Sequence, residues 1–386
     1  IVPLLQKEFP NADLHLSTQA SCVNSKAVKM YKNIGFKRVV LGREISLNEI
    51  KRIKDAVPDM ELETFVHGAM CIAYSGRCLM SAYLTGRSAQ SGACAHTCRW
   101  NFKVGTERKV MTPKEFAESG ELLLEEEQRP GEFFPVYEGD DYTAIMSSKN
   151  LCMIDHLADL KATGVDSIKI EGRMKSVYYV SMATRAYRKA LDALDGKITA
   201  SEAAPYIAEL ENVSHRNSTT GFYYNKSQAD ETTIGASDSK YQLAAQIGDE
   251  VSNEEFDKLL AEGQKRYSDF KQSLDGMHPA AREACLKDLQ VHTDRNVVPF
   301  EKKEGWHMYP CTAVNMIRAE DEVEFVSPQF CSLTARSGEW EIISSETGLK
   351  LNWVCDGHPA VIYTKYELPD GSLLRTLDSD YVDYAL

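Results

Sequence analysis

Residues 157–176 read Leu-Ala-Asp-Leu-Lys-Ala-Thr-Gly-Val-Asp-Ser-Ile-Lys-Ile-Glu-Gly-Arg-Met-Lys-Ser. The first seven residues form a helix-like run that stops at Gly164, and glycine is a common residue at a helix end. A β-branched run follows from Val165 to Ile170, and Gly172 interrupts it. The stretch therefore predicts a helix, a glycine stop and a strand in that order.

The same order recurs earlier in the chain. Residues 24–34 carry apolar side chains at helical spacing and end on Gly35. Short β-branched runs occur at 15–18, 38–41, 64–66 and 167–170. Strands that alternate with helices are typical of a parallel sheet with crossover helices. We therefore predict an α/β domain over residues 1–195, with an excursion at 101–146 whose turn residues indicate a β-hairpin.

The rest of the chain follows a different pattern. Residues 196–300 are mixed, and their polar helical part at 253–294 is broken at Gly276 and Pro279. From 301 to 386, short alternating runs such as 323–326 and 360–364 return, separated by turns. This pattern predicts a connecting region followed by a small antiparallel β-barrel or sandwich domain.

Length and composition are those of an ordinary globular protein. The 386 residues predict two or three domains, and 43% are hydrophobic and 26% charged. No window reaches the roughly 18 consecutive apolar residues of a membrane span, and no basic-then-apolar leader precedes a cleavage site. We expect a cytoplasmic protein. Because the chain starts at Ile1 in a helix-like run, we also expect it to begin inside a longer protein.

Charge is distributed unevenly between the two halves. Residues 1–200 carry 27 basic and 25 acidic side chains, whereas residues 201–386 carry 17 and 32. An acidic surface repels a polyanion. If RNA binds, we expect it on the first half, through local patches such as Arg185, Arg188 and Lys189 on one helix.

Four of the ten cysteines lie close together in the sequence. They fall within 28 residues, where an even spread predicts about 0.7: Cys71, Cys78, Cys94 and Cys98. Converging thiolates bind zinc or iron–sulfur clusters. Zinc sites favour pairs separated by about two to four residues, which only Cys94 and Cys98 satisfy, whereas clusters accept irregular spacing. Buried structural cysteines are the alternative, and spacing alone leaves zinc and iron both open.

Charged side chains gather where the strand at 167–170 ends. Lys169, Glu171 and Arg173 stand at alternate positions, which share one face of a strand, and Lys175 follows. In barrels, active sites form at this end of the strands. Three cations around one carboxylate suit a ligand with carboxylate or phosphate groups, and an ion-paired surface cluster is the alternative.

Three more polar residues follow predicted strands. Arg43 and Glu44 come after the strand at 38–41, and His67 comes after the strand at 64–66. They are candidates by the same argument, although a lone histidine is more often a core or surface residue. The chain has no serine-nucleophile elbow, Walker loop or Gly-x-Gly-x-x-Gly fingerprint, so nucleotide-driven and hydride-transfer chemistry lose their usual support.

Specific motifs over about residues 10–225 resemble those of a known family. They lie at 17–19, 43–44, 61–71, 74–78, 92–94, 98–100, 129–132, 148–152, 169–176, 215–216 and 220–222. Together they resemble peptidase family U32, the collagenase-like peptidases of unknown catalytic type. Several bacterial members are regarded as oxygen-independent hydroxylases of RNA or of ubiquinone precursors that carry a 4Fe-4S cluster. Within the family, the chain resembles the tRNA hydroxylation proteins, which make 5-hydroxyuridine at the wobble position.

The resemblance implies a TIM-like β/α barrel. A closed barrel takes roughly 250 residues, so this one is expected to be partial and to lack its first strands. The resemblance also implies a 4Fe-4S cluster on Cys71, Cys78 and Cys94, with Cys98 as the fourth ligand and Cys152 as the alternative.

The resemblance further implies prephenate as the source of the hydroxyl group. Such a dicarboxylate suits the cations, so we expect Arg43, Lys169, Arg173 and Lys175 to bind substrate. Glu44, His67 and Glu171 are the expected catalytic residues.

The expected function is therefore an RNA-modifying hydroxylase of tRNA wobble uridine, with tRNA bound by the N-terminal half. A collagenase-like protease is one alternative. A non-catalytic partner subunit of a hydroxylase complex is another. A partner subunit or a homo-oligomer is also expected.

Overall fold

The structure is a computed structural model that describes residues 1–99, 105–106, 109–110, 123–125, 133–138, 143–145, 148–213, 215–224, 239–284, 298–355 and 357–378. The chain divides into two compact units, Ile1–Asp238 and Ser239–Leu386. Their boundary lies inside the segment 196–300 that the sequence assigns to a connecting region. The motif residues 100 and 129–132 lie outside the described residues.

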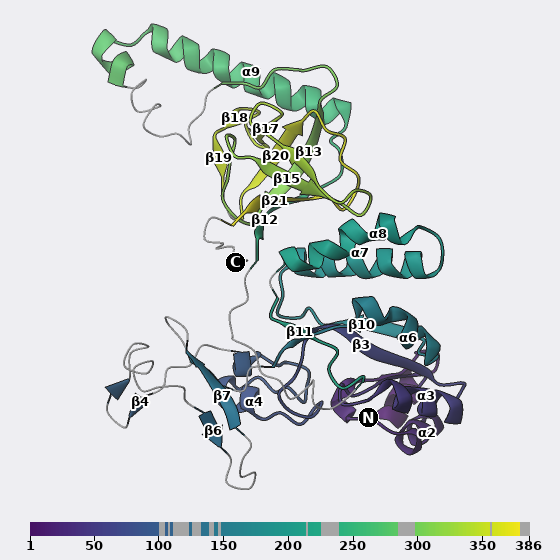
Figure 1. Cartoon of the computed structure of the whole chain (residues 1–386). Coiled ribbons are helices and arrows are strands. Elements are labelled where there is room, and N and C mark those ends of the chain that lie inside the picture. Colours follow the sequence, from purple (N-terminus) through teal and green to yellow (C-terminus); the bar gives the residue numbers. More distant parts are fainter. Residues whose placement is uncertain are drawn as a thin grey trace. The chain divides into compact units, whose positions relative to one another are not determined.

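The first unit is built on a six-stranded sheet (Figure 1). The strands are β1 (His15–Leu16), β2 (Arg38–Val40), β3 (Glu61–Ala69), β9 (Asn150–Cys152), β10 (Ser167–Ile170) and β11 (Ser218–Thr219). The order is β1-β2-β3-β9-β11, and β10 pairs with β3. β1, β2, β3 and β10 run parallel, as predicted, whereas β9 runs antiparallel to β3. The predicted parallel sheet is therefore confirmed for these four strands, and β9 adds an antiparallel strand because β3 extends past its parallel neighbours and pairs with β9 at His67–Ala69.

Helices connect and cover these strands. They are α1 (Val2–Glu8), α2 (Ser25–Ile34), α3 (Leu47–Ala56), α4 (Met80–Thr85), α6 (Leu157–Ala162), α7 (Val177–Leu194) and α8 (Ala200–Ala208). Gly35 ends α2 with φ +104°, as its position in the sequence predicts. A capping box between Ser46 and Glu49 begins α3. The mixed α/β class is thus confirmed, while the barrel stays a prediction: no pairing among the described strands joins β1 to β11.

The core of the first unit lies between the sheet and these helices. Val28 of α2, Ile50 of α3 and Leu160 of α6 are buried against strand residues such as Leu62 and Val66. Five short strands fall within the excursion: β4 (Gly105–Thr106), β5 (Lys109–Val110), β6 (Leu123–Glu125), β7 (Phe133–Glu138) and β8 (Thr143–Ile145). They pair antiparallel as β4-β5 and β6-β7-β8.

The second unit contains an eight-stranded antiparallel sheet, which confirms the predicted antiparallel domain. Its order is β16 (Leu333–Ala335), β15 (Val323–Val326), β21 (Leu373–Leu377), β12 (Tyr241–Ile247), β13 (His307–Ala313), β20 (Pro359–Thr364), β17 (Trp340–Ser344) and β18 (Lys350–Leu351). β14 (Ile317–Arg318) pairs with β19 (Trp353–Val354). Helix α9 (Asn253–Asp275) packs Phe256 onto Phe300 and Tyr363, and it ends at Gly276 as predicted.

No helix in the described ranges combines the length and apolarity that crossing a bilayer requires.

A close backbone approach fixes the end of β3 against the segment that follows β10. Gly68 has φ +106°, and a Cβ there would collide with the carbonyl oxygen of Glu171. The backbone N–H of Glu171 donates to the carbonyl of His67 at 2.9 Å, which locks the two segments together. Only glycine fits this position without strain.

We expect Gly68→Ala to lower the free energy of opening of β3 by about 3 kcal/mol, because left-handed strain and overpacking add. Gly86→Ala is the matched control, since Gly86 also has positive φ (+73°) but nothing lies within 4 Å of its Cβ position. We expect the control to lose only about 1 kcal/mol. Hydrogen-exchange mass spectrometry measures the opening free energy, on peptides that cover β3 for Gly68→Ala and on peptides that cover α4 for Gly86→Ala. Equal losses in the two variants would contradict this account.

Candidate functional site

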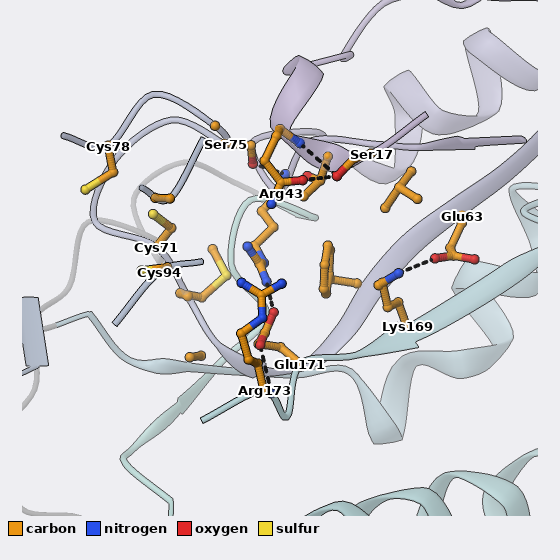
Figure 2. A pocket seen from close by; sticks show the side chains of 18 of the residues that line it. Ser17, Arg43, Glu63, Cys71, Ser75, Cys78, Cys94, Lys169, Glu171 and Arg173 are labelled. Carbon is orange, nitrogen blue, oxygen red and sulfur yellow. Dashed lines mark hydrogen bonds and ion pairs between the residues drawn. The ribbon is translucent and has the colours of Figure 1, made fainter. Parts of the chain in front are cut away.

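A cavity of about 400 Å³ lies at the carboxyl ends of the parallel strands. Ser17 and Gln19 follow β1, Arg43 follows β2, and Glu171 and Arg173 follow β10, and all of them line it. Because parallel strands end at one edge of the sheet, residues far apart in the sequence meet there. Figure 2 shows Arg43, Glu171 and Arg173 together, with Glu63 and Lys169 beside them.

A carboxylate is held in a fixed position inside this cavity. Nη2 of Arg43 lies 3.1 Å from Oε2 of Glu171, and both side chains are largely buried, with 13% and 19% of their surface exposed. The backbone N–H of Arg173 donates to Oε1 of Glu171 at 3.1 Å. The Arg43 guanidinium also lies 3.7 Å above the centre of the Phe65 ring. Glu171 is therefore oriented by two donors, one of which is itself held by a cation–π contact.

A second carboxylate, Glu63, pairs with Lys169 across neighbouring strands. Oε1 of Glu63 lies 2.9 Å from Nζ of Lys169, and Oε2 lies 3.3 Å from Nη1 of Arg38. Burial opposes ionisation of Glu63, but its hydrogen bonds with Lys169 and Ser167 outweigh burial and hold the pKa of this carboxyl below its ordinary value. Glu63 is therefore an anion that neutralises part of the charge of Lys169.

Arg173 is the cation in the cavity that is most available to a ligand. Its side chain is exposed, and no ion pair in the described part of the chain engages its guanidinium. An anionic group in the cavity would find Arg173 available, since Arg43 and Lys169 already have carboxylate partners.

The four clustered cysteines line the same cavity. None of them forms a disulfide in the part of the chain that the structure describes. Figure 2 shows Cys71, Cys78 and Cys94 grouped on one side of Arg43 and Arg173. Burial raises the pKa of the Cys71 thiol, and the neighbouring Cys78 and Cys94 raise it further. A hydrogen bond from the backbone N–H of Ala73 and the positive charge of Arg43 lower the same pKa. Cys78 and Cys94 are thus close enough to influence the ionisation of Cys71. A bound cation would favour the thiolate form.

Thiols are the ligands that iron–sulfur clusters take, so the chemistry of this donor set suits such a cluster. Four thiols line one cavity, and the backbone N–H of His96 donates to Sγ of Cys94 at 3.3 Å. Among the described residues, no three His, Cys, Asp or Glu side chains converge closely enough to hold a single metal ion. A cluster is larger than one ion, so its thiolate ligands stand farther apart.

The loop after Cys71 is anchored by Ser75. This residue is 2% exposed, and its hydroxyl accepts the backbone N–H of Arg43 at 3.1 Å. Its own N–H donates to the Glu44 carboxylate, and its carbonyl accepts the Ser21 hydroxyl. Glu44 is not among the residues that line the cavity. Its observed contact positions the cysteine loop.

His67, Cys152 and Lys175 lie away from the cavity lining, against helix α7. The His67 ring is 6% exposed and packs against Tyr179 and Tyr187, at centroid distances of 5.7 and 5.3 Å. Sγ of Cys152 lies 4.0 Å from the Tyr187 hydroxyl. Nζ of Lys175 lies 4.8 Å above the Tyr179 ring. The structure therefore groups these three predicted site residues with one another and not with the cavity.

The basic patch predicted on α7 is wrong for Arg185. This residue is 7% exposed, and its guanidinium lies 5.2 Å from the Tyr206 ring of α8. Lys189 also lies over Tyr206, at 4.9 Å, and Arg188 pairs with Asp192 at 2.8 Å. Arg185 and Lys189 therefore pack against Tyr206 of α8, and Arg188 forms an ion pair within α7.

Two cavity residues are not among those predicted from the sequence, Glu63 and His96. Glu63 lies within a strand, and an acidic residue two positions before Phe65 on a mostly apolar strand indicates a partner on the same face. His96 also lines the cavity and has φ +56°, a conformation that the sequence does not signal.

The family model of Peptidase family U32 matches residues 1–233, so the chain belongs to this family. The chain is 38% identical over 332 residues to the tRNA hydroxylation protein P of Escherichia coli, covering 80% of this chain and 72% of that protein. It is 40% identical over 248 residues to the Haemophilus influenzae protein of the same name, covering 58% and 53%. It is 31% identical over 255 residues to a 23S rRNA 5-hydroxycytidine synthase of Escherichia coli, covering 64% and 34%. No solved structure matches the chain significantly.

The buried histidine makes stability depend on pH. Burial lowers the pKa of His67 to about 4, and His215 and Lys175 act in the same direction. In the described part of the chain, no hydrogen-bond partner reaches its Nε2. His67 is therefore neutral in the folded protein at pH 7, whereas in the unfolded chain it takes up a proton near pH 6.5.

We expect acidification from pH 7.5 to 5 to cost about 2 kcal/mol of stability through His67, because the unfolded state binds more protons below pH 6.5. His67→Gln should remove this share of the pH dependence. His156→Gln is the matched control, since His156 lies at the surface beside Tyr224. Urea midpoints from pulse proteolysis at the two pH values provide the measurement. An unchanged pH dependence in His67→Gln would disprove the assignment.

Proposed function

We propose that this chain hydroxylates RNA and that the cavity at the strand ends is its active site. The carrying observation is that four cysteine thiols and the cations Arg43, Lys169 and Arg173 line one cavity. Relatives named for tRNA hydroxylation and for 5-hydroxycytidine synthesis in rRNA support the reaction class. The specific reaction that we propose is 5-hydroxylation of the tRNA wobble uridine in a partial TIM-like barrel.

Cys71, Cys78, Cys94 and Cys98 are the residues that would hold a 4Fe-4S cluster. When bound, such a cluster supplies electron transfer and Lewis acidity. In this proposal the thiols hold the cofactor, while the charged residues after β10 hold the co-substrate.

Prephenate is the proposed oxygen donor, and its carboxylates match the cationic side of the cavity. Arg173 binds one carboxylate, since its guanidinium is exposed and can form a bidentate pair. Lys169, which is 45% exposed and shares its charge with Glu63, contributes a weaker contact.

Glu171 is the group that we assign to proton transfer. Its carboxylate lines the cavity and is oriented by Arg43 and by the Arg173 backbone N–H. Glu44 and His67 act as positioning residues in this proposal, because one holds the Ser75 loop and the other packs against α7.

Anaerobically purified protein should contain about four iron and four sulfide ions per chain. Cys98→Ser should lower both, because Cys98 lines the cavity. Cys152→Ser, the matched control, should keep both, because Cys152 lies beside Tyr187. Iron and acid-labile sulfide analysis decides which of Cys98 and Cys152 is the fourth ligand. If Cys152→Ser lowered both contents and Cys98→Ser kept them, Cys152 would be the ligand. A colourless protein that cleaves gelatin would favour the protease alternative.

Deleting the gene should remove the hydroxylated nucleoside from RNA, and the wild-type gene should restore it. Arg173→Ala should reduce restoration roughly ten- to a hundredfold, the effect of losing a charge-assisted hydrogen bond. Arg336→Ala is the matched control, since Arg336 is 77% exposed and pairs only at the surface with Glu322. Nucleoside mass spectrometry of tRNA and rRNA gives the measurement. Unchanged 5-hydroxyuridine and 5-hydroxycytidine in the deletion strain would refute the proposed function.

A further inference from the structure

The cysteine segment carries an unusual number of exposed apolar side chains. Six of the nineteen large apolar residues found exposed in the described part of the chain lie between residues 72 and 84, where an even spread would place about one. Three of them are strongly exposed, at 72%, 65% and 89%: Tyr74, Leu79 and Tyr83. We call these three side chains the aromatic surface, after the two tyrosine rings.

The Tyr74 part of the aromatic surface is anchored by residues that line the cavity. Tyr74 directly precedes Ser75 and Gly76, which line the cavity. Ser75 is anchored through Arg43, Glu44 and Ser21, as described above. A Cβ at Gly76 would collide with the carbonyl of Gln19, so this turn is pressed against the segment after β1. With its two neighbours fixed, Tyr74 presents its ring at little entropic cost.

Tyr83 is held in a comparable way through helix α4. Two residues earlier, Ser81 is 1% exposed, and its hydroxyl accepts the backbone N–H of Ala95 at 2.9 Å. The same hydroxyl donates to the carbonyl of Arg87 at 2.7 Å. These bonds fix α4 to the stretch that carries Cys94, and they leave Tyr83 on the outside.

The sequence segment that carries the aromatic surface is one-sided in charge, and the Glu44 carboxylate reaches it from outside at the backbone N–H of Ser75. No acidic residue occurs from 64 to 106, whereas 57 acidic residues spread evenly over 386 would place about six there. Arg77, Arg87 and Arg173 are all exposed. In a chain of net charge −13, this segment is therefore a local basic region suited to a polyanion.

Exposed aromatic rings among arginines are the features that bind unpaired nucleic acid. Bases stack on the rings, and the cations contact the phosphates. A duplex keeps its bases stacked inside the helix, so rings at a surface cannot reach them. A cavity of about 400 Å³ likewise admits a base only after it has left its stack.

We propose that Tyr74 and Tyr83 stack on unpaired RNA bases beside the cavity, with Arg77 and Arg87 contacting the backbone phosphates. This rests on the proposed function, and it names the side chains outside the cavity that hold the RNA substrate. Leu79 adds an apolar contact to the same nucleotides.

The test compares the full-length protein with its variants in binding a labelled RNA hairpin that has a uridine-containing loop. Fluorescence anisotropy at fixed salt should show about a hundredfold weaker binding for Tyr74→Ala/Tyr83→Ala, because each stack contributes roughly tenfold. Tyr74→Phe/Tyr83→Phe should bind like wild type, since phenylalanine keeps the ring. Tyr224→Ala, which changes a tyrosine that packs on His156, should also bind like wild type. Arg77→Gln/Arg87→Gln should flatten the salt dependence.

Several outcomes would overturn the inference. Unchanged hairpin affinity in the alanine variant is one, and wild-type protein that binds the hairpin no better than the fully paired duplex is another. Unchanged RNA affinity together with loss of a co-purifying protein would assign the surface to a protein partner. Failure of the proposed function looks different: nucleosides would be unchanged in the deletion strain, while the alanine variant still lost hairpin binding.

Discussion

The parallel pairing of β10 with β3 is the constraint on which the site depends. It brings Lys169 beside Glu63 and carries the chain on to Glu171, whose backbone reaches the end of β3 at Gly68. Arg43 arrives from β2 by the same parallel arrangement and completes the pair with Glu171. Three segments that are distant in the sequence therefore form one charged wall.

The charges of this wall are balanced in a way that favours an anionic ligand. Both carboxylates are already paired, Glu63 with Lys169 and Arg38 and Glu171 with Arg43. Buried carboxylates need such partners, because an isolated charge is costly to remove from water. Once the pairs are formed, the remaining positive charge belongs mainly to Arg173, on the side of the cavity where the cysteines lie.

Local signals in the sequence predicted much of this arrangement. The glycine stops at Gly35 and Gly164 and the strand at 167–170 follow from spacing alone, because each depends on neighbouring residues. The extent of β3 did not follow, since Glu61 and Glu63 interrupt its apolar pattern and are stabilised there by Arg38, 23 and 25 positions away. The antiparallel pairing of β9 is likewise a long-range contact that no local pattern encodes.

The site was predictable to a similar degree. The end of a strand marked Arg43, Glu171 and Arg173 as candidates, and all three line one cavity because parallel strands share an edge. It did not indicate what His67 contacts, and the structure places that ring against Tyr179 and Tyr187. The position of a residue along a strand fixes where it lies in the sheet. The side chains that it contacts depend on how the covering helix packs.

The four cavity cysteines belong to one continuous stretch that contains α4 and no described strand of the sheet. Strand pairing in the first unit therefore does not rely on anything that the thiols bind. Oxidation of these thiols would therefore leave the circular dichroism spectrum of the protein essentially native. A preparation with oxidised cavity cysteines would look well folded, so a thiol assay is a better criterion of its quality than a folding assay.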